Sequence, residues 1–163
     1  MSTDASPPHR PPEPHSPGIA FALAQLGSHA TALFAQRMAE LDLTPAQAGL
    51  LRMLAATPGR SQRELAEDLR MPPSRFVPFI DELDERGLIE RLKNPNDRRL
   101  HAVHLTDAGG AMLEEIAKAA AAHERQLCVG LSSEERKQTL ELLNHIVKLQ
   151  GLKVGTHPGY RSM

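Results

Sequence analysis

The chain has 163 residues, of which 40% are hydrophobic and 24% charged, and its formal net charge is −1. This composition is that of a globular protein with one domain or two small lobes, and it excludes a mainly disordered chain. The single cysteine, Cys128, excludes an internal disulfide framework and fits a reducing compartment. No apolar run approaches the roughly 20 residues that span a bilayer, and the N-terminus has no apolar signal core. We therefore predict a cytoplasmic protein without membrane contact.

The N-terminal part of the chain divides into an arm and a long helix. Residues 1–18 hold six of the thirteen prolines and almost no large apolar side chains, so we expect a disordered arm. From Ile19 to Leu41, apolar residues recur in steps of three and four, which predicts an amphipathic helix of five or six turns. A helix of this length in a small protein usually buries one face against a second subunit.

Three shorter helices follow, and local signals mark where each begins. Residues 44–47 (TPAQ) and 61–64 (SQRE) are capping boxes, in which a hydroxyl and a side chain three residues later satisfy the first amides of a helix. The first of these helices ends before Pro58, and the second runs to Leu69. A tight turn over residues 71–74 then opens a helix that Gly87 ends.

The second and third of these helices form a predicted helix-turn-helix. Its small core would consist of Leu65, Leu69, Phe76 and Ile80, and Ala66 is small where the two helices must approach closely. In such a motif the second helix lies in the major groove of DNA and presents its N-terminal residues to base edges. Arg75 can donate two hydrogen bonds to guanine O6 and N7.

Pro78 lies within this second helix and leaves two possibilities open. If the helix begins at Pro72 or Pro73, the proline removes one backbone donor and should bend the helix one turn in. If the helix begins nearer Arg75, Pro78 falls in the first turn and costs little. In either case the position offers no side-chain donor to a base.

A β-hairpin follows, and it is the only β element that we predict. Leu88 and Ile89 begin one short strand, and the alternation over residues 101–106 (HAVHLT) predicts the other. Residues 94–97 (NPND) form a turn that leads into Arg98 and Arg99. An isolated hairpin needs helices to support it. Arginines at its tip suggest a wing that reaches into a minor groove, with Asp97 paired to Arg99 so that another guanidinium stays free.

The remaining chain is predicted to form two helices and a tail. Thr106 caps a long helix that continues through Leu127, and a capping box at residues 132–135 (SSEE) opens the last helix. Residues 151–163 are predicted to be a flexible tail.

The segments 84–91 (DERGLIER), 94–99 (NPNDRR) and 103–109 (VHLTDAG) resemble the MarR (multiple antibiotic resistance regulator) family, over about residues 20–150. This resemblance implies a mainly α-helical, winged helix-turn-helix fold that binds double-stranded DNA as a homodimer. Residues 19–43 and 107–150 would form a helical dimerisation lobe, and residues 44–106 the DNA-binding lobe. Relatives often carry a polar or basic residue where Pro78 stands. The predicted DNA-contacting residues are Ser61, Gln62, Arg63, Pro73, Ser74, Arg75, Val77, Pro78, Lys93, Asp97, Arg98 and Arg99.

The family resemblance also raises the question of an effector, since many members respond to phenolic or anionic molecules, to oxidants or to metals. We predict that His29, beside the apolar stripe of the first long helix, is a candidate hydrogen-bond donor to an organic effector. Cys128 is predicted to be a buried, inert thiol rather than a redox sensor. His101 and His104 should point to opposite faces of a strand, so we predict no bound metal and no cofactor.

The sequence thus predicts a sequence-specific transcriptional regulator, most simply a ligand-responsive repressor on a pseudo-palindromic operator. Two alternatives remain within the winged-helix class: a metal-responsive repressor, and a protein-interaction module that does not bind DNA. An enzyme would need a clustered set of acids, bases or nucleophiles, and the sequence contains none that we can identify.

Overall fold

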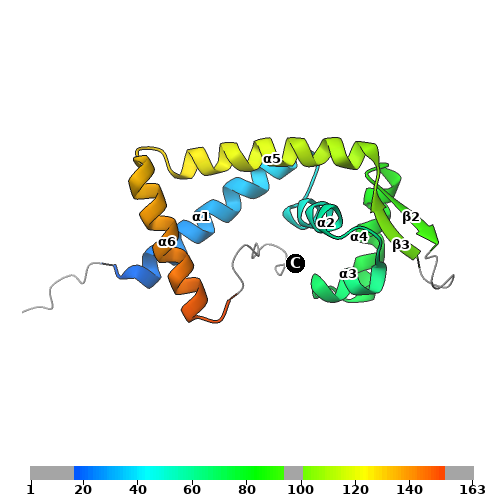
Figure 1. The fold of residues 1–163 in the computed structure, drawn as a ribbon, viewed down its shortest axis with the longest axis horizontal. Coiled ribbons are helices and arrows are strands. Elements are labelled where there is room, and N and C mark those ends of the chain that lie inside the picture. Colours follow the sequence, from blue (N-terminus) through cyan, green and yellow to red (C-terminus); the bar gives the residue numbers. More distant parts are fainter. Residues whose placement is uncertain (1–16, 94–100, 153–163) are drawn as a thin grey trace, which may run out of the picture.

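The computed structural model describes residues 17–93 and 101–152. Six helices and a small sheet follow one another in these segments (Figure 1). The helices and strands are α1 (Ile19–Ala39), α2 (Pro45–Ala56), β1 (Arg60–Ser61), α3 (Gln62–Asp68), α4 (Pro73–Glu85), β2 (Ile89–Lys93), β3 (His101–Leu105), α5 (Asp107–Leu127) and α6 (Ser133–Leu149). This element order confirms the predicted mainly α-helical winged helix-turn-helix.

Side-chain caps explain where four of these helices begin. The hydroxyls of Thr44, Ser61 and Ser132 each accept a hydrogen bond from the third helical amide, and each is part of a complete capping box. Thr106 caps α5 by accepting from the amide of Gly109. Each cap satisfies amides that would otherwise have no partner at the start of a helix. The predicted helix starts at these four positions are confirmed.

The sheet has three antiparallel strands in the order β1–β3–β2, so the prediction of a lone two-stranded hairpin was wrong. Arg60 of β1 pairs with Val103 of β3, and Arg91 of β2 pairs with the other side of Val103. The additional strand, β1, has only two residues and is too short to show an alternating pattern in the sequence. It joins the hairpin to the start of α3.

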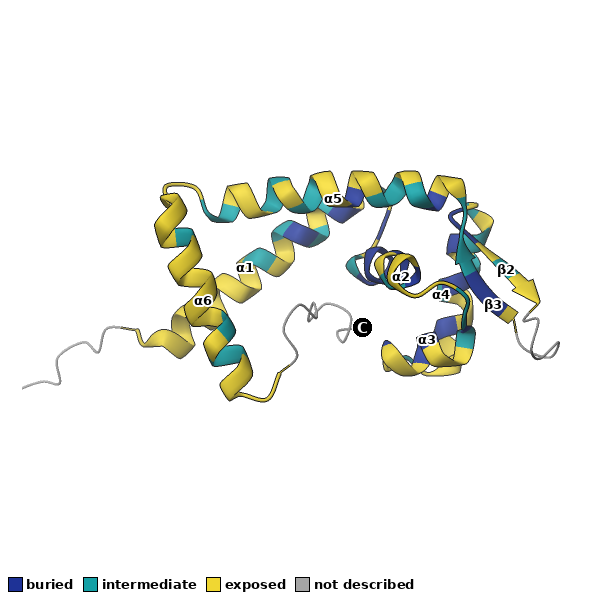
Figure 2. Ribbon diagram, in the orientation of Figure 1, coloured by how far each residue is buried: buried dark blue, intermediate teal, exposed yellow. Residues whose placement is uncertain are grey.

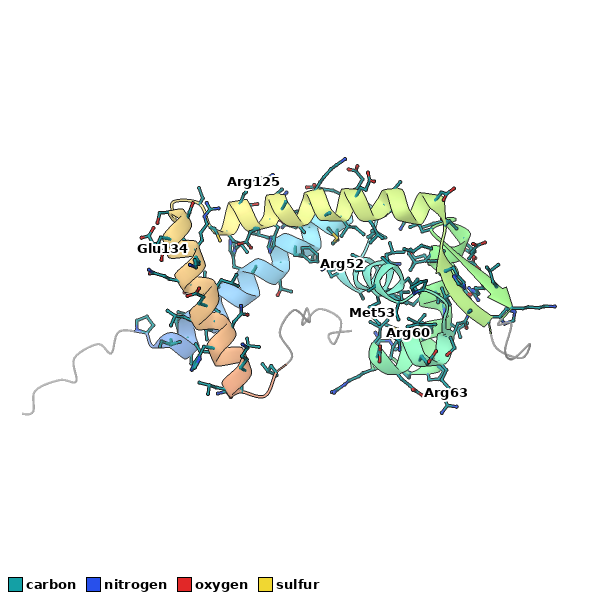
Figure 3. All side chains as sticks on the ribbon, viewed as in Figure 1. Arg52, Met53, Arg60, Arg63, Arg125 and Glu134 are labelled. Atoms are coloured by element: carbon teal, nitrogen blue, oxygen red, sulfur yellow. The ribbon has the colours of Figure 1, made fainter. Side chains whose placement is uncertain are left out.

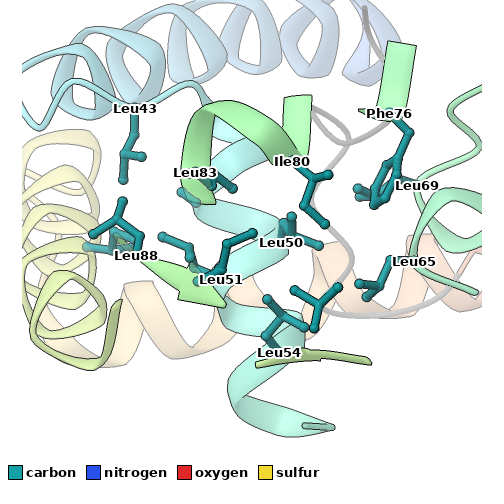
Figure 4. Packing of buried hydrophobic residues seen from close by; sticks show 14 of the residues in the cluster. Leu43, Leu50, Leu51, Leu54, Leu65, Leu69, Phe76, Ile80, Leu83 and Leu88 are labelled. Carbon is teal, nitrogen blue, oxygen red and sulfur yellow. The ribbon is translucent and has the colours of Figure 1, made fainter. Parts of the chain in front are cut away.

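The core lies between α2, α3, α4 and the sheet, and its fully buried side chains meet there (Figure 4). The four residues predicted for the helix-turn-helix core are all buried, and Ala66 is 7% exposed. The C-terminal half of α1 and the middle of α5 close this core from one side through Phe34, Met38 and Ile116. This arrangement confirms the predicted small core.

The half of the molecule that contains the start of α1 and all of α6 is much more exposed to solvent. The N-terminal half of α1 and the whole of α6 lie at this end of the molecule, and most residues of both helices are exposed in the single chain (Figure 2). No residue of α6 is buried. Within residues 17–93 and 101–152, no helix is both long and apolar enough to cross a bilayer. The predicted N-terminal arm and C-terminal tail fall almost entirely outside the described residues.

Candidate nucleic-acid interface

The first turns of α4 present an exposed face to solvent, while the opposite face is buried. Helix α4 begins at Pro73, with Pro72 as its N-cap residue. Phe76, Ile80 and Leu83 are buried against the core. The exposed side chains on the opposite face include four residues predicted to contact DNA, namely Ser74, Arg75, Val77 and Pro78. The helix therefore has the amphipathic form that a recognition helix needs.

Pro78 lies inside this helix, five residues after its first residue. The start at Pro73 agrees with the first of the two possibilities that the sequence left open. The proline lacks the amide hydrogen that would reach the carbonyl of Ser74. Because Ser74 is exposed, water can satisfy that carbonyl instead.

The start of α3 lies beside the start of α4, and residues from both helices line one cavity of about 860 Å³. Five of the predicted DNA-contacting residues line this cavity: Ser61, Gln62, Arg63, Pro73 and Val77. Most of its remaining surface is apolar, from Ala66, Met71 and Phe76. The sequence could suggest each helix separately, but only the fold brings these positions together.

The side chains at the start of α3 differ in how readily they can contact a DNA phosphate. Ser61 is 8% exposed, and its hydroxyl donates to Glu64 Oε2 at 2.7 Å as part of the capping box. The same hydrogen bonds lower the pKa of Glu64 below its ordinary value. The Arg63 side chain is 84% exposed (Figure 3), and it pairs with Glu67 at 2.9 Å. Arg63 and Gln62 are therefore better placed than Ser61 for side-chain contacts.

The predicted wing is described only at its base. Lys93 is exposed at the end of β2, whereas Asp97, Arg98 and Arg99 lie outside the described residues. The base of the wing is fastened to α4 by Arg91, whose Nη2 atom pairs with Asp81 and whose Nε atom lies 3.1 Å from Asp84 Oδ2. The second contact is close enough for electrostatic attraction but too poorly aligned for a hydrogen bond. No local sequence pattern predicts this pairing.

A second cavity, of about 400 Å³, lies between α2 and α5. Its walls are Leu113, Ile116, Ala117 and Ala120, and the guanidinium-bearing side chain of Arg52 completes the lining. Arg52 is exposed and interrupts an apolar run of α2, which is the one sequence signal for this position. A small organic anion would need this kind of lining, in which aliphatic side chains stand beside one cation.

The residues considered for effector sensing lie elsewhere. His29 is exposed on α1 and is not part of the α2–α5 cavity, so its role stays a prediction. His123 of α5 packs on the ring of Phe34, with 5.6 Å between the ring centroids, and its Nδ1 atom has no hydrogen-bond partner. Burial, and next the charge of Arg37, lower the pKa of His123. Within the described residues, no three metal-ligating side chains cluster.

Cys128 is half-buried at the end of α5, so the prediction of a buried thiol was wrong. It follows the last helical residue, where the chain turns towards α6 and packing is incomplete. Its Sγ atom donates to Glu124 at 3.3 Å. Burial and this carboxylate raise the pKa of the thiol, which disfavours the reactive thiolate that a redox sensor needs.

Comparisons with known proteins agree with the geometry of this face. The model of the MarR family matches residues 41–100. A transcriptional regulatory protein named for the hcr operon of Thauera aromatica is 33% identical over 106 residues, a match that covers 65% of this chain and 64% of that relative's own length. This relative is thus matched over slightly less than two thirds of its length.

Solved structures extend the similarity over more of the chain. The transcriptional repressor CouR, bound to a 23-mer DNA duplex, is 37% identical, with a TM-score of 0.66 over 79% of this chain and 92% of CouR. Wild-type MarR of E. coli in its apo form has a TM-score of 0.72, covering 82% of this chain and 99% of that one, and at 24% identity it supports the fold alone. These relatives are regulators rather than enzymes. With its helix-turn-helix, its wing base and these matches, the chain belongs to the MarR family.

Proposed function

We propose that this protein is a sequence-specific DNA-binding transcriptional regulator that acts in the cytoplasm as a homodimer, most simply as a repressor. The observation that carries the proposal is the exposed N-terminal face of α4, which stands beside the open start of α3. CouR, which is 37% identical, was solved on a DNA duplex, and this supports the same use of the fold here.

In this proposal the two parts of the molecule have separate roles. Residues 44–106 form the DNA-binding lobe, and residues 19–43 and 107–150 form the dimerisation lobe. Arg75 reads a base in the major groove, and Gln62, Arg63 and Lys93 contact phosphates. The assignment of Asp97 and Arg99 to the minor groove still rests on the sequence pattern alone.

We further propose that a small organic anion binds in the cavity between α2 and α5 and releases DNA. The cavity joins a helix of the proposed DNA-binding lobe to a helix of the proposed dimerisation lobe. A ligand there can shift the position of α4 only if it binds the two arrangements of the lobes with different affinity. Arg52 would pair with the anionic group, while the leucine, isoleucine and alanine walls would hold the apolar part.

The proposal is tested by footprinting the protein on the DNA that flanks its own gene, with and without phenolic acids. We expect protection of a pseudo-palindrome with half-sites about 10 base pairs apart, and loss of protection with an effective acid. Arg99→Ala should weaken binding in a gel-shift titration by about five- to 150-fold, because loss of a charged contact to DNA costs roughly 1–3 kcal/mol.

Arg125→Ala is the matched control for the removal of a positive charge, because Arg125 lies on α5, far from α3 (Figure 3). It should leave operator affinity unchanged, and the dimer mass of both variants is measured alongside. Affinity that is unchanged in Arg99→Ala would contradict the wing assignment. A flat salt dependence, with no shift of any duplex, would favour a protein-interaction module over a DNA-binding regulator.

A further inference from the structure

The C-terminal end of α4 contacts the loop that connects α1 to α2. Arg86 is the C-cap residue of α4. Its Nη1 atom donates to the backbone oxygen of Asp42, and its Nη2 atom donates to the backbone oxygen of Leu41 at 3.3 Å. Both acceptors lie just after the end of α1, so one guanidinium joins the proposed recognition helix to the long helix at the start of the fold.

The chemistry of this position favours an arginine. The last carbonyls of a helix lack intrahelical partners and carry partial negative charge, which attracts a cation. Arg86 lies at the carbonyl ends of two helices, α1 and α4. Hydrogen bonds from a charged donor are about twice as strong as those between neutral groups. The planar guanidinium can direct two donors at neighbouring oxygens, which a lysine cannot do in the same way.

A second contact fastens the same end of α4 to α5. The Thr106 hydroxyl donates to the Gly87 carbonyl at 2.6 Å and accepts from the Gly109 amide at 3.0 Å. The residues that follow α4 are thereby held to the first turn of α5. The end of α4 is thus held at two points, by Arg86 towards α1 and by Thr106 towards α5.

We infer that Arg86 is a positioning residue that fixes α4 relative to α1 and α5, and thereby sets the distance between the two recognition helices of the dimer. This inference rests on the proposed function, since the distance matters only for a dimer on two half-sites. Recognition helices of such a dimer lie about 34 Å apart, one turn of DNA. If α4 is held less firmly, it should adapt more easily to half-sites at a wrong spacing.

The experiment compares the wild type with Arg86→Gln on three duplexes. The half-site sequence comes from selection of random duplexes by the wild-type protein, and the spacing is the selected one, one base pair less or one base pair more. We expect Arg86→Gln to lose about tenfold in affinity for the selected spacing, as for the loss of charged hydrogen bonds. On the duplexes with one base pair less or more, the variant should lose much less affinity. The variant should therefore discriminate less than the wild type among the three spacings.

The matched control is Asp42→Asn, because Arg86 binds the backbone oxygen of Asp42 and not its carboxylate. Asn is also tolerated at the positive φ of 54° at this residue. We expect its spacing preference to equal that of the wild type. Thr106→Val should flatten the preference as Arg86→Gln does, and Thr106→Ser, which keeps the hydroxyl, should restore it.

Two results would overturn the inference. One is an unchanged preference among spacings in Arg86→Gln. The other is an equal loss of affinity on all three duplexes, which would indicate a direct phosphate contact. Dimer mass and helix content by circular dichroism show whether the variant is folded.

A measurement without DNA separates this inference from the proposed function. Hydrogen exchange of the amides of residues 40–44 should be about tenfold faster in Arg86→Gln, because the loop loses its two charged donors. Unchanged exchange there would overturn the role of Arg86. A wild-type protein that selects no duplex would instead overturn the proposed function, and the exchange result would still show whether Arg86 holds the loop.

Discussion

Gly109 and Gly110 are neighbours in the first turn of α5, but only Gly109 lies against another part of the backbone. A Cβ atom built on Gly109 would be 2.0 Å from the Leu88 carbonyl oxygen and 3.0 Å from a methyl carbon of Leu105. Nothing lies within 4 Å of a Cβ atom on Gly110. The close approach at Gly109 lets the base of the sheet and the start of α5 touch, so the glycine serves packing rather than a special backbone angle.

These two glycines give a matched pair of stability predictions. We expect Gly109→Ala to lower the free energy of unfolding by about 2 kcal/mol or more, because backbone must move to admit the methyl group. Gly110→Ala should raise it by up to about 1 kcal/mol through helix propensity. Chemical denaturation at one protein concentration measures both. An unchanged midpoint in Gly109→Ala would contradict the close contact.

At the scale of elements, β2 and α4 are held together by an arginine between two carboxylates. Arg91 has a 22% exposed side chain and faces Asp81 and Asp84, one turn apart on α4. Its charge is largely neutralised there, so it is not available to a phosphate. Lys93, two residues later on the same strand, is exposed.

We therefore predict different DNA-binding phenotypes for these two cations. Arg91→Gln should reduce operator affinity by about fivefold, since a partly exposed ion pair contributes roughly 1 kcal/mol, and should leave the salt dependence unchanged. Lys93→Gln should reduce the slope of log affinity against log salt by about 1. Titrations at several salt concentrations measure both slopes. A reduced slope in Arg91→Gln would show that Arg91 contacts phosphate directly.

The sequence was most informative where a local rule decides the structure. Capping boxes at Thr44, Ser61 and Ser132 marked three helix starts, and the spacing of apolar residues identified the core of the helix-turn-helix. Strand β1 was not predicted, because two residues are too few to show an alternating pattern of apolar and polar side chains. This strand forms only by pairing with β3. Local patterns also could not reveal Arg86 and Arg91, because their partners become neighbours only in the folded chain.

Exposure of the long helices was harder to predict than their existence. The apolar stripe of α1 was expected to pack along one face, yet in the single chain only Phe34 and Met38 of α1 are buried. The sequence pattern shows that a face is apolar, but it does not show whether the same chain covers that face. Burial of this face against the second subunit of the proposed homodimer would explain the difference.

At the scale of the whole molecule, the proposed dimerisation lobe lacks a core of its own. On one face of α1, Ile19 is 73% and Leu26 is 60% exposed, and on one face of α6 Leu140 is 60% and Leu143 is 38% exposed. Both helices are exposed along most of their length at this end of the molecule (Figure 2). Exposed apolar side chains that follow one face of a helix are typical of a protein–protein interface. The surface stands at the opposite end of the molecule from α3 and the sheet.

A charge placed in this surface should therefore separate the subunits without unfolding the DNA-binding lobe, whose core does not include α6. We expect Leu140→Glu combined with Leu143→Glu to give a monomer by sedimentation. In a dimer, each subunit would bury two unpaired carboxylates in the interface. Operator affinity should fall by at least about a hundredfold, since a monomer engages only one half-site and loses the gain from linked binding. Gln138→Glu combined with His145→Glu adds the same two charges at exposed positions on the opposite face of α6 and should remain a dimer. A dimer in the leucine double variant would place the subunit interface elsewhere, whereas a monomer with full operator affinity would mean that a single α4 and its wing suffice for binding.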